Sequence, residues 1–219
     1  MPFVRILMSF LRSEQAYNDF GLGRDRQLVR LTALLHDVGH APFSHASEDL
    51  LPSSEHGDSY RHEAYSARIV ERHFRQVIEG HRANNNWGFR AEDVSVLLEG
   101  RPEARQSLFW RQLIDSQLDA DRMDYLLRDS HHTGVAYGKF DLSRLVSTVC
   151  AVPGMKGSSS RLGIKEKGWH AAEALVLARY FMFTQVYFHK TRVAYDIHLQ
   201  GALKEMLPGV FSQSLKGRN

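Results

Sequence analysis

The chain has 219 residues, of which 43% are hydrophobic and 24% charged, so it can bury a core without disulfides. Its single cysteine, Cys150, excludes an intramolecular disulfide and favours a reducing, cytoplasmic setting. Residues 1–129 carry 16 basic and 20 acidic groups, and residues 130–219 carry 12 and 5, so phosphate contacts are expected in the second part. No apolar run is long enough for a membrane span, and we expect no membrane association.

The first predicted helix rests on apolar residues that recur at helical spacing and end before Gly39. These residues are Leu28, Leu31, Leu35 and Val38. We expect this helix to end at His36-Asp37. A second helix is predicted across about residues 62–80, and the polar residues 81–88 are expected to form a loop.

The pattern then predicts a short helix at Ala91–Glu99 and a long helix from about Ala104 to His131, interrupted at Gly134. The periodicity changes after this glycine, and the next elements read as strands rather than helices.

Two short strands are predicted at Val149–Pro153 and Arg161–Lys165, around a turn rich in glycine and serine. An isolated hairpin is stable only when it packs on other elements. A final helix of roughly thirty residues is expected to start near Trp169. The sequence therefore predicts one mostly helical domain with a small β element.

Twelve histidines are the unusual feature of the composition, and three of them cluster with a carboxylate after the first predicted helix. These are His36, Asp37, His40 and His45. A buried aspartate must be paired or bound to metal, because an uncompensated buried charge costs several kcal/mol. Imidazole and carboxylate together suit Mn, Fe, Zn, Ni or Co better than Ca. Hydrogen-bonded structural histidines are the alternative interpretation.

A second set of polar residues lies on one face of the predicted helix around residue 125. That face carries Asp121, Tyr125, Arg128, Asp129 and His132, and the opposite side carries Ala120, Met123 and Leu127. The stretch from Asp119 to Tyr125, followed by Arg128-Asp129 and His131-His132, is the best source of a further oxygen ligand for a metal. The alternative is an ordinary solvated helix face.

Two further pairs could carry proton transfer. His62-Glu63 opens the second helix, where the imidazole could act as acid or base and the glutamate could orient it. His45 and Glu48 are three residues apart, so the carboxylate can hold the imidazole as a general acid requires. A glutamate at a helix start is also ordinary helix-dipole chemistry, and the second pair could be purely structural.

In this order and spacing, the residues resemble the HD superfamily of metal-dependent phosphohydrolases, named for the pair matched by His36-Asp37. The run from Leu34 to His45 resembles the branch that contains deoxynucleoside triphosphate triphosphohydrolases. The run from Asp119 to His132 resembles that branch's second signature, and His62-Glu63 falls at its HE pair. The hairpin followed by a helix with His189-Lys190 also fits. The resemblance implies an all-α HD-domain helical bundle with a small two-stranded β-hairpin.

The resemblance implies a role for each matching position. A divalent ion (Mn, Fe, Zn, Ni, Co or Mg) would be held by His36, Asp37 and Asp121. The hydrolytic centre would hold His40, His45, His62 and Glu63, with Glu48 supporting His45. Substrate contacts would come from Arg122 toward phosphate and from Tyr125 and Asp129 toward deoxyribose. Lys190 and Arg192, from the basic second part of the chain, are further candidates for the phosphate tail, and an ordinary solvated basic helix is the alternative. Arg122 stands where a lysine is common, and a guanidinium can bind phosphate through two bonds.

The N-terminus departs from the family pattern, which supplies its first metal histidine from an upstream R-F-x-H type segment. The first histidine here is His36. We expect residues 1–219 to form a single HD domain that lacks this segment and the family's C-terminal extension. A shortened chain, a misassigned start, or water or His40 in the ligand's place are the open explanations. Loss of one of four ligands should weaken metal retention by well over about tenfold.

The function expected from the resemblance is hydrolysis of deoxynucleoside triphosphates at the α-phosphate, giving deoxynucleoside and triphosphate. One alternative is hydrolysis of another nucleotide phosphate ester by the same centre. Another is a non-catalytic module that binds nucleotides or single-stranded nucleic acid through the basic C-terminal half. The expected partners are a nucleotide substrate and further copies of the chain in a homo-oligomer.

Overall fold

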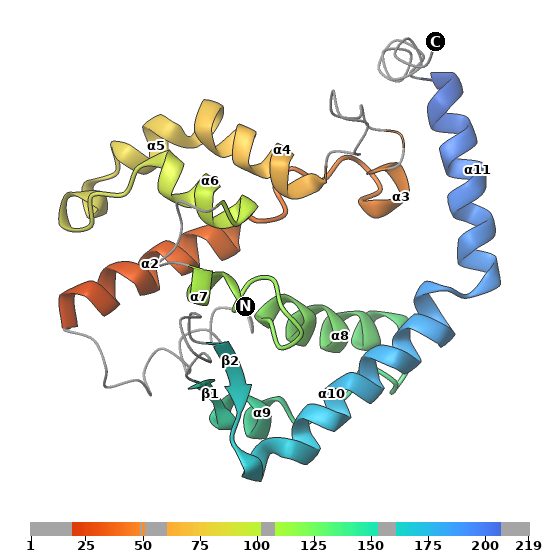
Figure 1. The fold of residues 1–219 in the computed structure, drawn as a ribbon. Coiled ribbons are helices and arrows are strands. Elements are labelled where there is room, and N and C mark those ends of the chain that lie inside the picture. Colours follow the sequence, from red (N-terminus) through yellow and green to blue (C-terminus); the bar gives the residue numbers. More distant parts are fainter. Residues whose placement is uncertain (1–18, 49, 51–60, 102–107, 153–160, 207–219) are drawn as a thin grey trace. The chain divides into compact units, whose positions relative to one another are not determined.

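A computed structural model describes residues 19–48, 50, 61–101, 108–152 and 161–206, which fold mainly into helices (Figure 1). A two-stranded antiparallel sheet accompanies them, so the predicted fold class is confirmed. The α-helices are α2 (Asp19–Leu35), α3 (His45–Glu48), α4 (His62–Ile69), α5 (Arg75–Glu79), α6 (Ala91–Glu99), α7 (Leu108–Arg111), α8 (Ala120–Thr133), α9 (Leu142–Thr148), α10 (Trp169–Met182) and α11 (Lys190–Met206). Short 3-10 or π turns are η1 (Val70–Phe74), η2 (Arg82–Asn86), η4 (Glu166–Gly168) and η5 (Phe183–Tyr187). The strands are β1 (Val149–Val152) and β2 (Arg161–Ile164).

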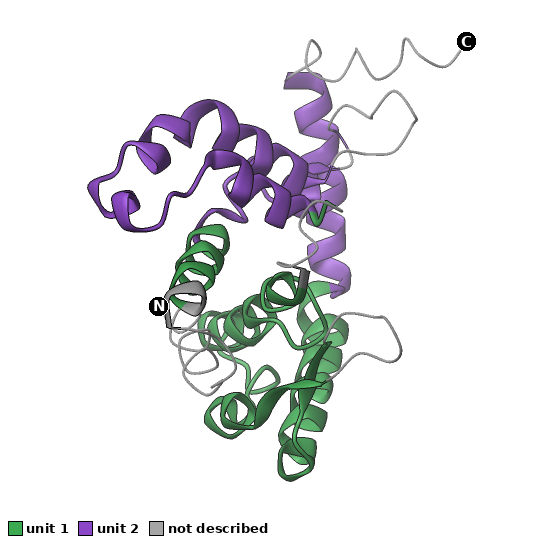
Figure 2. Ribbon diagram, turned by 60° about the vertical axis from the view of Figure 1, so that its left-hand side comes forward, with its two compact units in different colours: residues 1–33, 100–187 green, residues 34–99, 188–219 purple. Residues whose placement is uncertain are grey.

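The chain divides into two compact units, each built from two separate stretches of sequence (Figure 2). Unit 1 takes residues 1–33 and 100–187, and unit 2 takes residues 34–99 and 188–219. The expectation of a single domain stays a prediction. No helix among the described residues is long and apolar enough to cross a membrane.

The core of unit 1 is formed by the apolar faces of α8, α9 and α10. Its buried members are Ala120, Met123, Leu126, Leu145, Ala171, Leu175 and Met182. The apolar back predicted for α8 is therefore correct at Ala120 and Met123, but Leu126 takes the fully buried place that was expected of Leu127. This core fixes which face of α8 is left for polar side chains.

The predicted hairpin of unit 1 is confirmed. Val149 pairs with Ile164 and Val152 pairs with Arg161, in antiparallel register. Neighbouring segments hold the hairpin at both ends, because the Leu162 N–H donates to Gln112 Oε1 at 3.0 Å and the Lys165 N–H donates to the Thr148 carbonyl at 2.9 Å. The predicted turn at residues 153–160 lies outside the described residues.

The single long helix expected from Ala104 to His131 is wrong, because α7 ends at Arg111 and α8 begins only at Ala120. Residues 104–107 lie outside the described part of the chain. Asp119 separates the two helices: its Oδ1 accepts the Arg122 N–H at 2.6 Å and its Oδ2 accepts the Ser116 N–H at 2.9 Å. The first bond caps α8 and the second closes the preceding turn. Burial raises the pKa of Asp119 to about 6, although both N–H bonds oppose the rise.

The prediction of one continuous final helix of roughly thirty residues is also wrong. Helix α10 passes into the π turn η5, and α11 begins afresh at Lys190. His189 Nδ1 accepts the Thr191 N–H at 3.3 Å, so a histidine takes the place of a usual capping residue. In contrast, Gly134 ends α8 as predicted, with the left-handed φ of 73° that glycine tolerates.

In unit 2, the helix predicted at residues 62–80 is present as α4, η1 and α5, with a π turn inside it. Helix α6 has the predicted bounds. The polar residues 81–88 hold the short 3-10 turn η2, and Asn84 closes it by exchanging two hydrogen bonds with the backbone of Phe89. The core of this unit includes Ala67, Val70, Ile78, Val94, Leu97 and Leu98.

The turn that carries His36 and Asp37 is fastened to α4 by a buried serine. Ser66 Oγ donates to the His36 carbonyl at 2.6 Å and accepts the Gly39 N–H at 2.8 Å. A Cβ atom added at Gly39 would overlap the Ser66 nitrogen and the His62 carbonyl oxygen. Glycine is needed here because two backbones approach closely, and this approach sets the distance between the turn and His62.

Gly39→Ala should destabilise the protein by several kcal/mol, since the new methyl group meets backbone atoms that cannot move away cheaply. Ser66→Ala should cost about 2 kcal/mol, because it takes a hydrogen-bond partner from the buried Gly39 N–H and from the His36 carbonyl. The matched control is Gly201→Ala in α11, where nothing lies within 4 Å of the added atom and alanine should be neutral or stabilising by up to about 1 kcal/mol. Urea unfolding followed by circular dichroism measures all three, and equal midpoints for both glycine variants would contradict the close-approach argument.

Asp119→Ala should lower the free energy of unfolding by about 2 kcal/mol, because the residue is only 3% exposed and two N–H groups lose their acceptor. Asp119→Asn should be milder, since the amide oxygen can still cap α8 while its NH₂ faces the second donor. The order wild type, Asn, Ala in the midpoint of urea unfolding tests the cap. An Asn variant as unstable as the Ala variant would show that charge, not capping, is what matters here.

Candidate functional site

The histidines and acids after α2 gather around two carboxylates of unit 2. Asp37 is the first: its Oδ1 lies 3.2 Å from His36 Nε2, 3.4 Å from His40 Nε2 and 3.9 Å from His62 Nε2. The Ser66 bonds hold the turn that presents His36 and Asp37, so their positions are set by backbone packing as well as by their own contacts.

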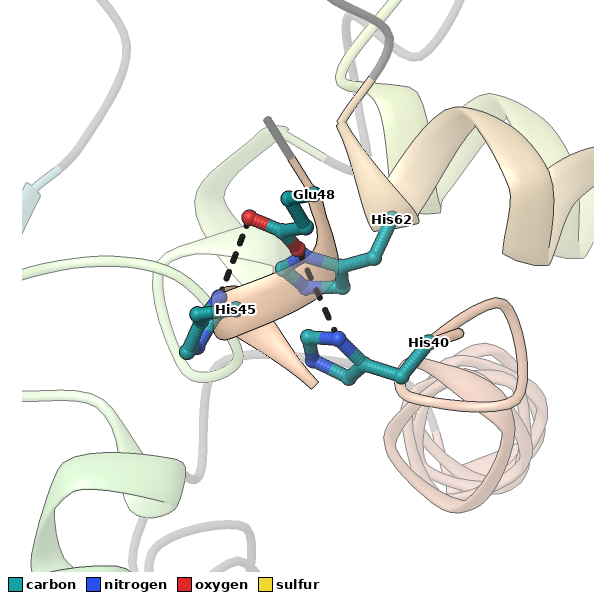
Figure 3. Close-up of side chains that lie close together, drawn as sticks. All are labelled: His40, His45, Glu48 and His62. Carbon is teal, nitrogen blue, oxygen red and sulfur yellow. Dashed lines mark hydrogen bonds and ion pairs between the residues drawn. The ribbon is translucent and has the colours of Figure 1, made fainter. Parts of the chain in front are cut away.

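Glu48 is the second carboxylate, and three imidazoles converge on it (Figure 3). Its Oε1 lies 2.8 Å from His62 Nδ1 and 3.5 Å from His40 Nδ1, and its Oε2 lies 3.1 Å from His45 Nδ1. The predicted pairing of His45 with Glu48 is present, but the carboxylate serves two further histidines that the spacing did not reveal. We call His40, His45, Glu48 and His62 the Glu48 cluster.

The rings of His40 and His62 stack, with centroids 3.9 Å apart and planes 16° from parallel. Each ring therefore turns Nδ1 toward Glu48 and Nε2 toward Asp37. Both side chains are 16% exposed, whereas His45 is 67% exposed. His45 is thus the member of the Glu48 cluster that a molecule from solvent meets first.

Two members of the Glu48 cluster, Glu48 and His40, have pKa values below their usual range. Burial pushes the pKa of Glu48 up, but hydrogen bonds and attraction from His45 and His62 outweigh it and hold that pKa below its usual range. Burial and the like charge of His62 lower the pKa of His40, against the attraction of Asp37. At neutral pH, Glu48 is therefore ionised and His40 is a neutral imidazole.

Two features of the backbone place His45 and Glu48 where they are. Phe43 and Ser44 have φ values of 70° and 53°, the left-handed region that residues other than glycine seldom adopt, and they reverse the chain before α3. The short helix α3 is then tied to α11, because Gln200 Nε2 donates to the Ala46 carbonyl at 2.9 Å. Gln200 was not found by sequence reasoning, since nothing in its surroundings marks a contact 154 residues away.

Glu63 lies beside the cluster rather than in it. Its Oε2 is 3.6 Å from His62 Nδ1. This distance is within the range of an ion pair but too long for a hydrogen bond. The same oxygen is buried and has no hydrogen-bond partner among the described residues. The prediction that Glu63 orients His62 stays a prediction, because Glu48 makes the shorter contact.

The residues predicted to bind sugar lie in unit 1, on α8. Asp129 Oδ2 accepts a hydrogen bond from the Tyr187 hydroxyl at 2.8 Å, and the Tyr125 ring meets the Tyr187 ring edge to face. Burial raises the pKa of both tyrosines, and the bond to Asp129 adds to the rise for Tyr187. Tyr187 was missed by sequence reasoning, although it stands just before the His189-Lys190 pair.

The basic residues predicted to contact phosphate have acidic neighbours of their own. Arg122 Nη1 lies 3.3 Å from Asp119 Oδ2, and Arg192 Nη2 lies 3.2 Å from Asp196 Oδ2. Lys190 is exposed at the start of α11, ten residues before Gln200 and hence about 15 Å along the helix axis from it. Their roles toward a substrate stay predictions.

The predicted site residues thus fall into two groups. Unit 2 brings together His36, Asp37, His40, His45, Glu48, His62 and Glu63, and its second stretch carries Lys190 and Arg192. Unit 1 holds Asp121, Arg122, Tyr125 and Asp129. The proposed ligand set of His36, Asp37 and Asp121 takes members from both units and stays a prediction.

Comparison with known proteins identifies relatives of this chain. The chain is 38% identical over 165 residues to the uncharacterized protein YwfO of Bacillus subtilis, which covers 75% of this chain and 34% of YwfO. It is 25% identical over 189 residues to a deoxynucleoside triphosphate triphosphohydrolase SAMHD1 homolog of Dictyostelium discoideum, over 83% of this chain and 34% of the homolog. The chain therefore spans about a third of the length of these relatives.

The structure of a phosphohydrolase from Bacteroides thetaiotaomicron, BT4208, superposes with a TM-score of 0.68 at 30% sequence identity, over 95% of this chain and 46% of that one. Residues 140–214 match the model of an HD associated region. Residues 6–129, which contain His36-Asp37, the Glu48 cluster and the start of α8, match the model of the HD domain. The chain belongs to the HD domain family.

Proposed function

We propose that this chain hydrolyses deoxynucleoside triphosphates at the α-phosphate, releasing the deoxynucleoside and triphosphate. The observation that carries the proposal is the convergence of three imidazoles on Glu48 beside the His36-Asp37 turn. It offers an oriented proton donor next to donor atoms that suit a divalent ion. The similarity to a triphosphohydrolase and to a structure named phosphohydrolase supports the same reaction class. A homo-oligomeric assembly and a cytoplasmic location stay predictions.

The His36-Asp37 pair fits a divalent metal ion by the chemistry and spacing of its donors. His36 Nε2 and Asp37 Oδ1 are 3.2 Å apart, the separation expected of adjacent ligands whose bonds to an ion are about 2.0–2.2 Å. We propose Asp121 as a further ligand. A bound ion would act as a Lewis acid on the α-phosphate and lower the pKa of water.

His45 is the proposed general acid. Glu48 holds its Nδ1, which leaves Nε2 as the nitrogen that can present a proton to the substrate. As water attacks phosphorus and the bond to the 5′-oxygen breaks, this proton passes to that oxygen, and the nucleoside leaves as an alcohol. The Glu48 carboxylate, 3.1 Å from His45 Nδ1, orients the ring for this transfer. His62, on the same carboxylate, is the alternative acid.

The remaining residues would bind the substrate. Asp129 is held by the Tyr187 hydroxyl, and we propose that it accepts a hydrogen bond from the 3′-hydroxyl of the sugar, with Tyr125 packed against deoxyribose. We propose that Arg122 contacts phosphate, with Lys190 and Arg192 contributing to the phosphate tail.

Product analysis tests the reaction. The purified chain incubated with the four deoxynucleoside triphosphates and Mn²⁺ should yield deoxynucleosides and intact triphosphate by mass spectrometry. Asp121→Asn should reduce both Mn²⁺ retention and turnover by more than about tenfold, with unchanged helicity. Nucleoside monophosphate as the product would favour cleavage elsewhere in the phosphate chain, and bound nucleotide without turnover would favour a binding module.

His45→Gln should lower kcat by at least about 100-fold, as expected when a general acid is removed. The matched control is His170→Gln: His170 also precedes a glutamate by three residues, is 95% exposed, and places Nδ1 2.9 Å from Glu173 Oε2. That variant should keep full activity. Equal rates for the two variants would remove His45 from the mechanism.

A further inference from the structure

We propose that the Glu48 cluster is itself a metal site, selective for zinc-class ions and separate from the ion expected at His36 and Asp37. All of its members lie in unit 2. The proposal concerns a second ion and does not depend on which substrate the protein hydrolyses.

The geometry of the cluster suits a small four-coordinate ion. One donor atom from each of His40, His45, Glu48 and His62 can be chosen so that all four lie within 4.8 Å of one another. The three Nδ1 atoms are 2.8, 3.1 and 3.5 Å from oxygens of Glu48. Ligand atoms around a tetrahedral zinc ion with bonds of about 2.0–2.1 Å are separated by about 3.3 Å. One of the stacked rings of His40 and His62 must turn before both can direct a nitrogen lone pair at the same ion.

The donor types select the class of ion. Three imidazole nitrogens and one carboxylate oxygen match the ligands that Zn²⁺ takes in proteins. Ca²⁺ and Mg²⁺ prefer shells made mainly of oxygen, and this cluster offers too few of them. The set is also complete at four ligands, which is typical of a closed site rather than of one that keeps a position open for substrate.

The charge around the cluster also favours a cation. Three carboxylates, from Asp37, Glu48 and Glu63, lie within 3.9 Å of nitrogens of His62. One imidazole ring has only two nitrogens and cannot satisfy all three carboxylates. Glu63 Oε2 is buried and without a hydrogen-bond partner among the described residues, so the His62 surroundings hold more negative charge than their hydrogen bonds compensate.

An ion can reach the cluster through its exposed member. His45 is 67% exposed and stands on the one-turn helix α3, whereas His40 and His62 are each 16% exposed. His45 can therefore bind an ion from solvent and close it against the two less accessible rings.

Occupancy of this site has a consequence that rests on the proposed function. Coordination takes the nitrogen lone pairs of His45 and His62 and the charge of Glu48, the groups proposed to hold and deliver a proton. Zn²⁺ in the cluster should therefore inhibit triphosphate release, although the same ion class would suit the His36-Asp37 pair.

Zinc titration against a competing chromophoric chelator tests the site without any measurement of activity. The background is Asp121→Asn, which removes a proposed ligand of the other ion and leaves the Glu48 cluster intact. We expect one tightly bound Zn²⁺ in this background and a loss of affinity of more than about tenfold on adding His45→Gln or, separately, Glu48→Gln. The control is His170→Gln, which removes an exposed His and Glu pair that lies outside the Glu48 cluster. This variant should leave the affinity unchanged.

A second readout covers the case in which Glu48→Gln folds poorly. Bound Zn²⁺ should raise the melting temperature of the Asp121→Asn chain, and the exposed substitution His45→Gln should abolish that rise. Zinc affinity that does not respond to His45→Gln, or no zinc bound to the Asp121→Asn chain, would overturn the proposal. A chain without hydrolytic activity would defeat the proposed function and leave these binding results to decide the zinc site.

Discussion

The hydroxyl of Ser66 is the contact on which the rest of the site in unit 2 depends. It joins the His36 carbonyl and the Gly39 N–H to α4, so it fixes two segments about thirty residues apart at one separation. Gly39 permits that separation because it has no Cβ atom to push the backbones apart. The distance from Asp37 to His62 follows from this seating. Ser66 has no proposed part in the reaction, yet it sets the distance between the His36-Asp37 turn and α4.

Much of this arrangement could be predicted from sequence, and the failures have physical causes. The helices ending at Gly80 and Gly134, the hairpin and the pairing of His45 with Glu48 are all local, so short-range spacing determines them. The breaks before α8 and α11 were missed because neither contains glycine or proline. Asp119 and His189 cap those helices from within continuous helical patterns, and only the tertiary structure shows that their side chains turn back to the backbone.

The same difference between local patterns and long-range contacts applies to the site. Its residue types were visible from the sequence, because imidazoles and carboxylates are conspicuous beside an apolar helix. Its connections were not: Glu48 serves His62 and His40 as well as His45, and Tyr187 holds Asp129 across 58 residues. These contacts join segments whose separation in sequence has no periodicity. Gln200, which ties α3 to α11, is the extreme case.

The stacked imidazoles of His40 and His62 make the two carboxylates of unit 2 interdependent. Each ring turns one nitrogen to Asp37 and the other to Glu48. Burial lowers the pKa of His40, and this ring in its neutral form carries a single proton. A proton on Nδ1 can be donated to Glu48. Nε2 then directs its lone pair at the Asp37 carboxylate, and the two repel each other. Any cation that neutralises Asp37 therefore favours this tautomer and holds the protons on the Glu48 side. The stacked rings in this way couple charge compensation at Asp37 to the protons that face Glu48.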